Sequence, residues 1–264
     1  MAFMNENLKK TERKKTTGTS WGKVAGWYDE LLEEGLGTYQ SELILPNLMR
    51  LLALRKGERM LDVACGQGFF AREFAKAGAA VTGVDVAGAL LNLARERSPR
   101  EIKFVAAPAE KLPFASASFD AAACVLAIQN IKNAAGAFGE CARVLVPGGR
   151  FVIVMNHPAF RIPKRSAWGF DEEKKIQYRR IDEYISESSA AIAVHPGVKN
   201  STSTISFHRP LQFYFKAFGK AGFAVTRLEE WVSDKKSLPG PRATAENKAR
   251  REFPLFLAMV AKKI

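Results

Sequence analysis

The chain has 264 residues, of which 47% are hydrophobic and 25% charged, a balance typical of a globular domain that buries a substantial core. No apolar run is long enough to cross a bilayer and the N-terminus is polar and basic, so we expect neither a membrane-spanning nor a secreted protein. The odd number of cysteines predicts reduced thiols in a cytoplasmic protein, and no Cys or His spacing suggests a metal site.

The formal net charge of +13 is distributed unevenly along the chain. Residues 151–264 hold 20 Lys and Arg against 11 Asp and Glu, whereas residues 56–150 hold 12 against 9. A basic half raises the local concentration of anionic partners, either nucleic acid or a phosphorylated or carboxylated small molecule. A basic surface that serves only solubility is the alternative interpretation.

The N-terminal region contains no strand pattern. Residues 1–20 are polar with a basic cluster, and we expect a mobile tail ahead of one domain that covers residues 21–264. Helical spacing of apolar residues begins near Trp21, and a second helix is expected from about Gln40 to Leu54. Pro46 makes the start of this helix uncertain, because proline suits the first turn better than the interior.

Strand and helix patterns then alternate. An alternation of this kind predicts a parallel sheet with right-handed crossovers, in which ligands lie beyond the carboxyl ends of the strands. We expect strands at 59–64, 80–84, 103–106, 120–126 and 150–155, and helices at 68–77, 87–98 and 134–144.

Residues 157–210 break the alternation and are too long for a bare connection in a compact domain. We expect them to form a partly helical cap over the ligand crevice, inserted after the fifth strand. A helix at 210–221 and strands at 223–232 and 255–262 follow, with a short helix in the link between these two strands.

The most informative segment is Leu61–Ala71, a buried strand that breaks at Gly66-x-Gly68 and enters a helix. The glycines allow close backbone approach to a ligand, and the helix presents free N–H groups to it. Asp62 ends this strand, and Asp85 ends the next, where an acid can bind the hydroxyls of a ribose. The pattern also fits a dinucleotide fingerprint, but Asp62 beside the turn suits a cationic ligand better than a pyrophosphate. A strand, turn and helix without a ligand is the remaining alternative.

These residues resemble the class I S-adenosylmethionine-dependent methyltransferases, in particular the ubiquinone and menaquinone biosynthesis type. The resemblance covers about residues 55–156. Motif I corresponds to Leu61-Asp62-x-x-Cys65-Gly66-x-Gly68, and the family's ribose-binding acid corresponds to Asp85. The family's "AExLPF…SFD" block corresponds to Ala109–Phe114 with Ser118-Phe119-Asp120, and its turn before the fifth strand corresponds to Ala142–Phe151.

The resemblance implies an α/β Rossmann-like fold: a seven-stranded, mostly parallel sheet with an antiparallel C-terminal hairpin and helices on both faces. It implies S-adenosyl-L-methionine as cofactor. The residues expected to contact it are Asp62, Ala64, Gly66, Gln67, Gly68, Asp85, Val86, Ala109, Glu110 and Leu126. Two positions depart from the family pattern, since Ala64 stands where glycine is frequent and Pro108 where an acid usually contacts the adenine.

Methyl transfer from a sulfonium requires alignment of the acceptor and exclusion of water, and a base helps where the acceptor carries a proton. His157 follows the fifth strand and is our first candidate for that base; His195 and His208 are the other two histidines, and each could instead bond only to backbone. The resemblance suggests that Tyr28, in an N-terminal helix, lines the methyl-transfer site; a core contact is the alternative.

Several polar residues are candidates for contact with the acceptor. Gln129 and Asn130 follow the fourth strand, and arginines in the inserted segment can grip a carboxylate or phosphate. Structural ion pairs with Asp171, Asp182 and Glu183 are the alternative for these arginines. The predicted acceptor-binding residues are Gln129, Asn130, Arg161, Arg179 and His208.

We therefore expect an enzyme that methylates a small molecule, anionic or aromatic, under a cap. An RNA methyltransferase that uses the basic C-terminal half is the alternative enzyme, although no separate RNA-binding module is visible. A non-catalytic regulator that binds the cofactor is a third hypothesis. The sequence does not indicate an oligomeric state.

Overall fold

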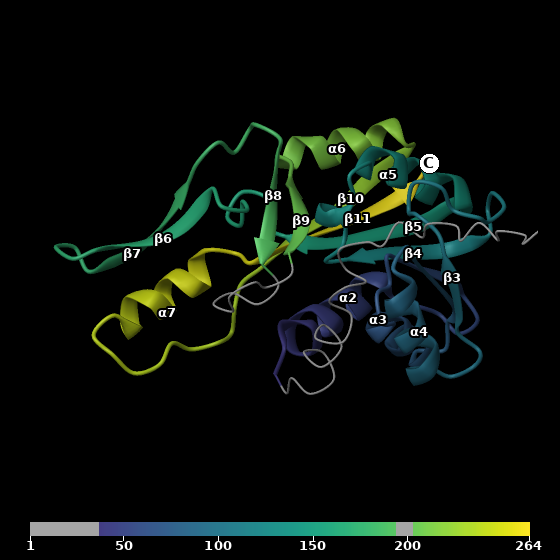
Figure 1. Cartoon of the computed structure of the whole chain (residues 1–264), viewed down its shortest axis with the longest axis horizontal. Coiled ribbons are helices and arrows are strands. Elements are labelled where there is room, and N and C mark those ends of the chain that lie inside the picture. The colour runs from purple at the N-terminus through teal and green to yellow at the C-terminus, as the bar shows by residue number, and fades with distance from the viewer. Residues whose placement is uncertain (1–36, 194–202) are drawn as a thin grey trace, which may run out of the picture.

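The computed structural model describes residues 37–193 and 203–264, and the structural statements below concern these residues. Their main feature is a seven-stranded sheet in the order β10-β11-β5-β4-β1-β2-β3 (Figure 1). The strands are β1 (Arg59–Val63), β2 (Ala80–Asp85), β3 (Lys103–Ala106), β4 (Phe119–Val125), β5 (Leu145–Asn156), β10 (Phe223–Trp231) and β11 (Phe256–Lys263).

The five strands from β3 to β5 pair in parallel, whereas β11 is antiparallel to β5 and β10 is antiparallel to β11. This confirms the predicted fold class. The chain builds outward from β1 to β3 and then returns to place β4 on the other side of β1. The strand order therefore reverses between β1 and β4, the point where open α/β sheets bind their ligands.

Helices cover both faces of the sheet (Figure 1). One face carries α5 (Ala134–Val144) and α6 (Leu211–Lys220). The other carries α2 (Leu45–Leu52), α3 (Phe69–Lys76) and α4 (Gly88–Arg97). The predicted second helix is split, because a π-helical turn, η2 (Gln40–Ile44), precedes α2 and Pro46 lies in the first turn of α2, where its missing N–H costs nothing.

Successive side chains of the central strands enter different cores, as the period of two in a strand requires. In β5, Phe151 and Ile153 pack into the core under α5 and α6, while Val152 and Val154 pack into the core under α2 and α3. The first core contains an aromatic cluster in which Phe138 contacts the rings of Phe151 and Phe218 edge to face. Both faces of these strands are buried, which explains why the strands read as continuous apolar runs.

The inserted segment differs from the prediction. Its described residues form two antiparallel hairpins, β6 (Ser166–Asp171) with β7 (Ile176–Ile181) and β8 (Ser188–Ala193) with β9 (Ser203–His208). The expectation of a partly helical segment is therefore wrong for these residues. The short helix predicted in the later link is present as α7 (Ala243–Glu252), which contacts β7 beside the main sheet (Figure 1).

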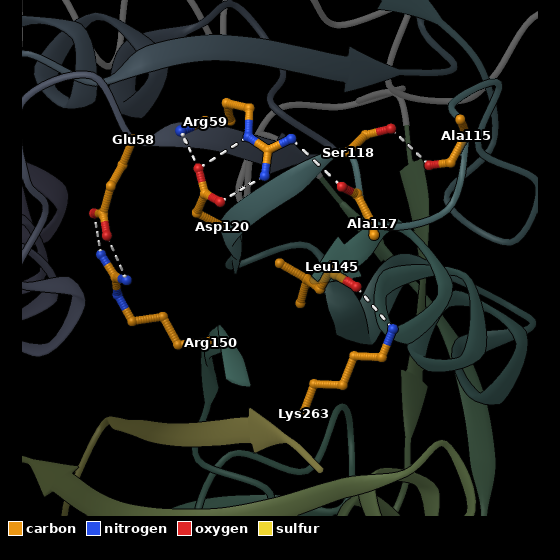
Figure 2. A network of polar contacts seen from close by, with 9 residues as sticks. All are labelled: Glu58, Arg59, Ala115, Ala117, Ser118, Asp120, Leu145, Arg150 and Lys263. Atoms are coloured by element: carbon orange, nitrogen blue, oxygen red, sulfur yellow. Dashed lines mark hydrogen bonds and ion pairs between the residues drawn. The ribbon is translucent and has the colours of Figure 1, made fainter. Parts of the chain in front are cut away.

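A network of polar contacts fastens the amino ends of the central strands (Figure 2). Arg59, the first residue of β1, binds Asp120 near the start of β4 through Nη2 and Oδ1, 2.6 Å apart. Arg150 binds Glu58 in the same way. These arginines lower the pKa values of the Asp120 and Glu58 carboxyls. The network lies at the opposite ends of the strands from the cavities described next, so it supports the sheet and not the site.

Candidate active site

A tight turn leads from β1 into α3. Three of its residues have left-handed backbone conformations: Ala64 with φ 57°, Gly66 with φ 57° and Gly68 with φ 81°. A Cβ on Gly68 would lie 3.0 Å from Cζ of the Phe104 ring, so a side chain there would require that ring to move by a few tenths of an ångström, and the left-handed conformation itself favours glycine. Ala64 adopts this left-handed conformation with strain, because its Cβ crowds the following carbonyl oxygen.

The acid at the end of β2 holds this turn. Asp85 is buried, and its Oδ2 accepts a hydrogen bond from the backbone N–H of Gly66 at 2.9 Å. Its Oδ1 accepts another from the N–H of Ala87 at 2.8 Å. Burial raises the pKa of Asp85, and these backbone donors oppose that effect. Each carboxylate oxygen keeps a second lone pair, so Asp85 can still accept bonds from two ligand hydroxyls.

Asp62 is the second buried acid of the site. It is 2% exposed, and its Oδ2 has no hydrogen-bond partner among the described residues. Burial, reinforced by the nearby charge of Asp85, raises the pKa of Asp62 to about 7. A buried carboxylate oxygen without a partner is costly unless a ligand supplies one, and a cationic group does so best.

Two adjoining cavities lie at the carboxyl ends of β1, β2 and β4. The first, the turn cavity, follows the glycine turn and is lined among others by Asp62, Gly66, Asp85, Leu90 and Leu126. The second, the β3-side cavity, is lined among others by Pro108, Ala109, Glu110 and Lys132. The two cavities share Ala64, Asp85, Val86, Asn130 and Ile131.

Nearly all residues predicted to contact the cofactor line one of these cavities. Gly68 is the exception, since it lines neither and serves the turn instead. The β3-side cavity is lined by Pro108 and by Lys132, which lies in the loop after β4. Some residues that line these cavities were not predicted, although they lie within a few residues of the predicted motifs: Phe69, Phe70, Val125, Ile131 and Lys132.

A third cavity, here called the hairpin cavity, lies where the β8–β9 hairpin meets the ends of β4 and β5. Its volume of about 340 Å³ is within the range of small-molecule sites. It shares Leu126 and Asn130 with the turn cavity. Its walls are Gln40, Leu126, Gln129, Asn130, Asn156, Arg161, Pro163, Ile192, Thr204 and Ser206.

Amides and hydroxyls dominate the polar surface of the hairpin cavity. Gln129 donates from Nε2 to the carbonyl of Leu126 at 2.8 Å, while its buried Oε1 has no partner among the described residues. Thr204 and Ser206 point to the buried side of β9. Thr204, Ser206 and Asn156 were not predicted as site residues. Asn156 was predictable, because it ends the parallel strand β5, where ligands bind in such sheets.

His157 does not face the crevice as expected. Its Nε2 lies 2.7 Å from Oε1 of Glu230 on β10, and its Nδ1 accepts from the backbone N–H groups of Ala159 and Phe160. Burial lowers its pKa, which favours the neutral ring. With both nitrogens engaged and no cavity described above lined by it, His157 is not placed to take a proton from an acceptor.

Some of the other residues predicted to act in catalysis or to contact the acceptor line a cavity, and others do not. His208 is 4% exposed and its Nε2 lies 2.7 Å from the carbonyl oxygen of Tyr184, so it fastens the hairpin and lines no cavity described here. Tyr28 and His195 lie outside the described residues. Arg161 lines the hairpin cavity with Gln129 and Asn130, whereas Arg179 lines a neighbouring cavity.

Two other arginines of the inserted segment form structural ion pairs, the alternative to contact with the acceptor. Arg180 pairs with Asp182, and Arg165 pairs with Glu183. Arg161 and Arg179 form no ion pair with a described carboxylate. Their hydrogen bonds go instead to Asn156, Phe160 and Ser166.

The parallel sheet, the glycine turn after β1, the acid after β2 and the cavities at the strand-order reversal define a Rossmann-like protein with a nucleoside-type site. Residues 61–153 match the sequence pattern of the family described as "Methyltransferase domain". The crystal structure of an S-adenosylmethionine dependent methyltransferase from Mesorhizobium loti superposes with a TM-score of 0.69 and 27% identity, covering 86% of this chain and 100% of that one. The chain belongs to the class I S-adenosylmethionine-dependent methyltransferases.

Two curated relatives extend the similarity. The biotin biosynthesis bifunctional protein BioHC of Cellvibrio japonicus is 30% identical over 79% of this chain and 40% of its own length. The ubiquinone/menaquinone biosynthesis C-methyltransferase UbiE of Brucella anthropi is 34% identical over 57% of this chain and 61% of its own. The chain thus spans less than two thirds of either relative, so these relatives do not establish its acceptor.

The residues present fit the family's cofactor, S-adenosylmethionine. The unpartnered Oδ2 of Asp62 suits its ammonium group, and the free lone pairs of Asp85 suit its ribose hydroxyls. Val86 is an apolar side chain that lines both cavities although it is 49% exposed, a surface that an adenine ring can cover. No helix among residues 37–193 and 203–264 has the length and apolarity needed to cross a membrane.

Proposed function

We propose that this protein methylates a small molecule that binds in the hairpin cavity. The observation that carries the proposal is that Leu126 and Asn130 line both this cavity and the turn cavity. A molecule in the hairpin cavity therefore meets the cofactor site at these two residues. The dimensions of the cavity suit a small molecule better than a polymer.

When bound, S-adenosylmethionine supplies an electrophilic methyl group. In our proposal Asp62 and Asp85 fix the cofactor's position, and Gln129 and Asn130 orient the acceptor through their amides. Leu126, Pro163 and Ile192 keep water from the acceptor. These residues contribute alignment, which is the main requirement of an in-line displacement.

The described walls of the hairpin cavity contain no His, Asp, Glu or Lys that could serve as a general base. We therefore propose an acceptor atom that is already nucleophilic near neutral pH. Tyr28 stays a predicted site residue. The two curated relatives are named for biotin biosynthesis and for ubiquinone/menaquinone biosynthesis. By analogy with them, we propose a small-molecule acceptor for this chain.

We also propose a cytoplasmic location. All three cysteines of the chain are described and none forms a disulfide. Cys124 and Cys141 lie in the core, and burial raises the pKa of each thiol, which keeps both thiols neutral. Unpaired cysteines of this kind are usual in a reducing compartment.

The test is to incubate the full chain with methyl-labelled S-adenosylmethionine and fractionated cell extract. We expect label in small metabolites, and expect the substitution Asn130→Ala to reduce its incorporation. The exposed substitution Arg180→Gln is the matched control and should leave it unchanged. Label in RNA or protein, with none in small molecules, would overturn the proposal.

A further inference from the structure

A fourth cavity, here called the arginine cavity, adjoins the hairpin cavity at Arg161. Its volume is about 320 Å³. Three arginines line it, from three separate segments: Arg161 after β5, Arg179 on β7 and Arg250 on α7. No Asp or Glu among the described residues lines it. The β6–β7 hairpin and α7 each contribute residues to its lining. These elements lie beside the main sheet (Figure 1).

Neutral contacts hold two of these guanidinium groups in place. Arg179 donates from Nε to the carbonyl of Phe160 at 2.8 Å and from Nη2 to Oγ of Ser166 at 2.7 Å, and it lies 5.0 Å from the Trp168 ring centre. Arg161 donates from Nη1 to Oδ1 of Asn156 at 2.7 Å. A guanidinium has five N–H donors, so each group keeps donors for a ligand.

This arrangement contrasts with that of two other partly buried arginines, Arg143 and Arg150. Arg143 and Arg150 each bind a carboxylate, those of Glu140 and Glu58. Among the described residues no carboxylate pairs with Arg161: burial lowers its pKa, the charge of Arg179 lowers it further, and Tyr39 opposes this by raising it. An arginine nevertheless stays protonated at neutral pH. Buried charge is costly when no counter-charge is present, and an anion in the cavity would supply one.

Four of the other residues that line the arginine cavity are aromatic, and the rest are Ser233, Pro254 and Leu255. Tyr39, Phe160, Trp168 and Phe253 surround the arginines, and the Trp168 and Phe253 rings meet edge to face at 5.4 Å. Aromatic walls bury the apolar body of a ligand, whereas inorganic anions gain nothing from them. The cavity thus combines a cationic centre with an apolar surround.

We propose that the arginine cavity binds the carboxylate or phosphate group of an organic acceptor, held between Arg161 and Arg179 with its adjacent apolar part against the aromatic walls. The proposal rests on the proposed function. Because Arg161 lines both cavities, an elongated acceptor can place its anionic end here and its reacting atom in the hairpin cavity. The anionic group then serves to position the reacting atom.

The experiment measures binding of three probes of one shape to the full chain, each in the presence of saturating S-adenosylhomocysteine. Benzoate and phenyl phosphate carry the anion, and benzyl alcohol is the neutral control. We expect at least one anion to bind at least tenfold more tightly than benzyl alcohol. The anion that binds more tightly identifies the group as carboxylate or phosphate. Equal binding of all three probes would overturn the proposal.

The variants Arg161→Gln and Arg179→Gln should each weaken anion binding about tenfold or more and leave benzyl alcohol binding unchanged. Arg180→Gln is the matched control, because Arg180 neighbours Arg179 in sequence but is exposed and lines none of these cavities. Arg179→Lys keeps the positive charge but lacks the paired N–H donors of a guanidinium, so we expect a loss of anion binding smaller than that of Arg179→Gln. This variant tests the site even if Arg179→Gln does not fold. Undiminished anion binding by all three variants would contradict the site.

Binding of S-adenosylhomocysteine is measured first and separates the two proposals. If it binds and neither anion is preferred, the arginine cavity is wrong and the methyltransferase proposal stands. If it does not bind, the proposed function itself fails.

Discussion

The carboxylate of Asp85 accepts a hydrogen bond from the backbone N–H of Gly66 at 2.9 Å, so the acid that ends β2 also fixes the turn that follows β1. One side chain therefore serves both the fold and the site. Its Oδ1 holds the N–H of Ala87 ahead of α4, which joins the start of the next helix to the same carboxylate. A substitution at this position should affect stability and cofactor binding together.

We expect Asp85→Ala to weaken S-adenosylhomocysteine binding by about 10- to 150-fold, the effect of losing charge-assisted bonds worth roughly 1.5–3 kcal/mol. We also expect a loss of stability of about 1–3 kcal/mol, since the N–H groups of Gly66 and Ala87 lose their acceptor. Asp85→Asn keeps one acceptor oxygen and should have a smaller effect on both. Calorimetric titration and urea unfolding measure the two quantities. An unchanged dissociation constant would show that Asp85 does not contact the ribose.

Asp62 gives a prediction about pH. With its pKa at about 7 in the folded protein, Asp62 is mostly protonated below that pH. A cationic ammonium group favours the ionised form, so affinity for S-adenosylhomocysteine should rise as pH rises from 5.5 to 7 and then level off. The increase approaches tenfold per pH unit at the acid end. In Asp62→Asn the rise should vanish, and a wild-type affinity that is flat over this range would contradict the assignment.

The raised pKa of Asp62 also predicts how the stability of the ligand-free protein depends on pH. The folded pKa of Asp62 lies above the ordinary value of 3.8. Its contribution to stability is therefore complete below about pH 4 and is lost as pH rises through about 7. We expect Asp62→Asn to narrow the difference in unfolding free energy between pH 5 and pH 8. Urea unfolding at both values measures it, with wild type as reference.

The sequence predicts those parts of the fold that leave a pattern in neighbouring residues. Buried parallel strands read as apolar runs, and Asp62 and Asp85 stand at strand ends where the topology itself brings them together. The inserted segment was not predictable in this way. In β9 the buried face carries Thr204, Ser206 and His208, so the usual alternation of apolar and polar residues is absent.

His157 shows a second limit of sequence reasoning. It follows β5 directly, which suggested a place in the crevice, but its partner Glu230 is 73 residues away on β10. Nothing local to His157 signals that contact. The sequence predicts that Arg161 contacts the acceptor, and this role stays a prediction. Its place in a cavity lined by no described carboxylate depends on where β7 and α7 pack, which no local pattern indicates.

The ion pairs at the amino ends of the strands should support the fold without affecting the site (Figure 2). A double-mutant cycle with Glu58→Gln and Arg150→Gln should give a coupling of about 0.5–1 kcal/mol at pH 7, because both partners are partly exposed. The pKa of Glu58 is lowered from 4.5, so this stability is complete above about pH 4.5 and is lost as pH falls through the folded pKa. The coupling should thus shrink near pH 3. Cofactor affinity should remain at the wild-type value, and a large change in it would contradict this division between fold and site.

The final prediction compares two glycine-to-alanine substitutions. Gly68 has φ 81°, and a Cβ there would lie 3.0 Å from the Phe104 ring and 3.2 Å from Cβ of Ala94. Strain and crowding together should cost about 2–4 kcal/mol of stability and shift the turn that binds the cofactor. Gly139 lies exposed within α5 with nothing near its Cβ position, so Gly139→Ala should stabilise the protein by about 0.5–1 kcal/mol. Urea unfolding and titration with S-adenosylhomocysteine measure both variants. Wild-type stability and affinity in Gly68→Ala would show that the turn tolerates a side chain at this crowded, left-handed position.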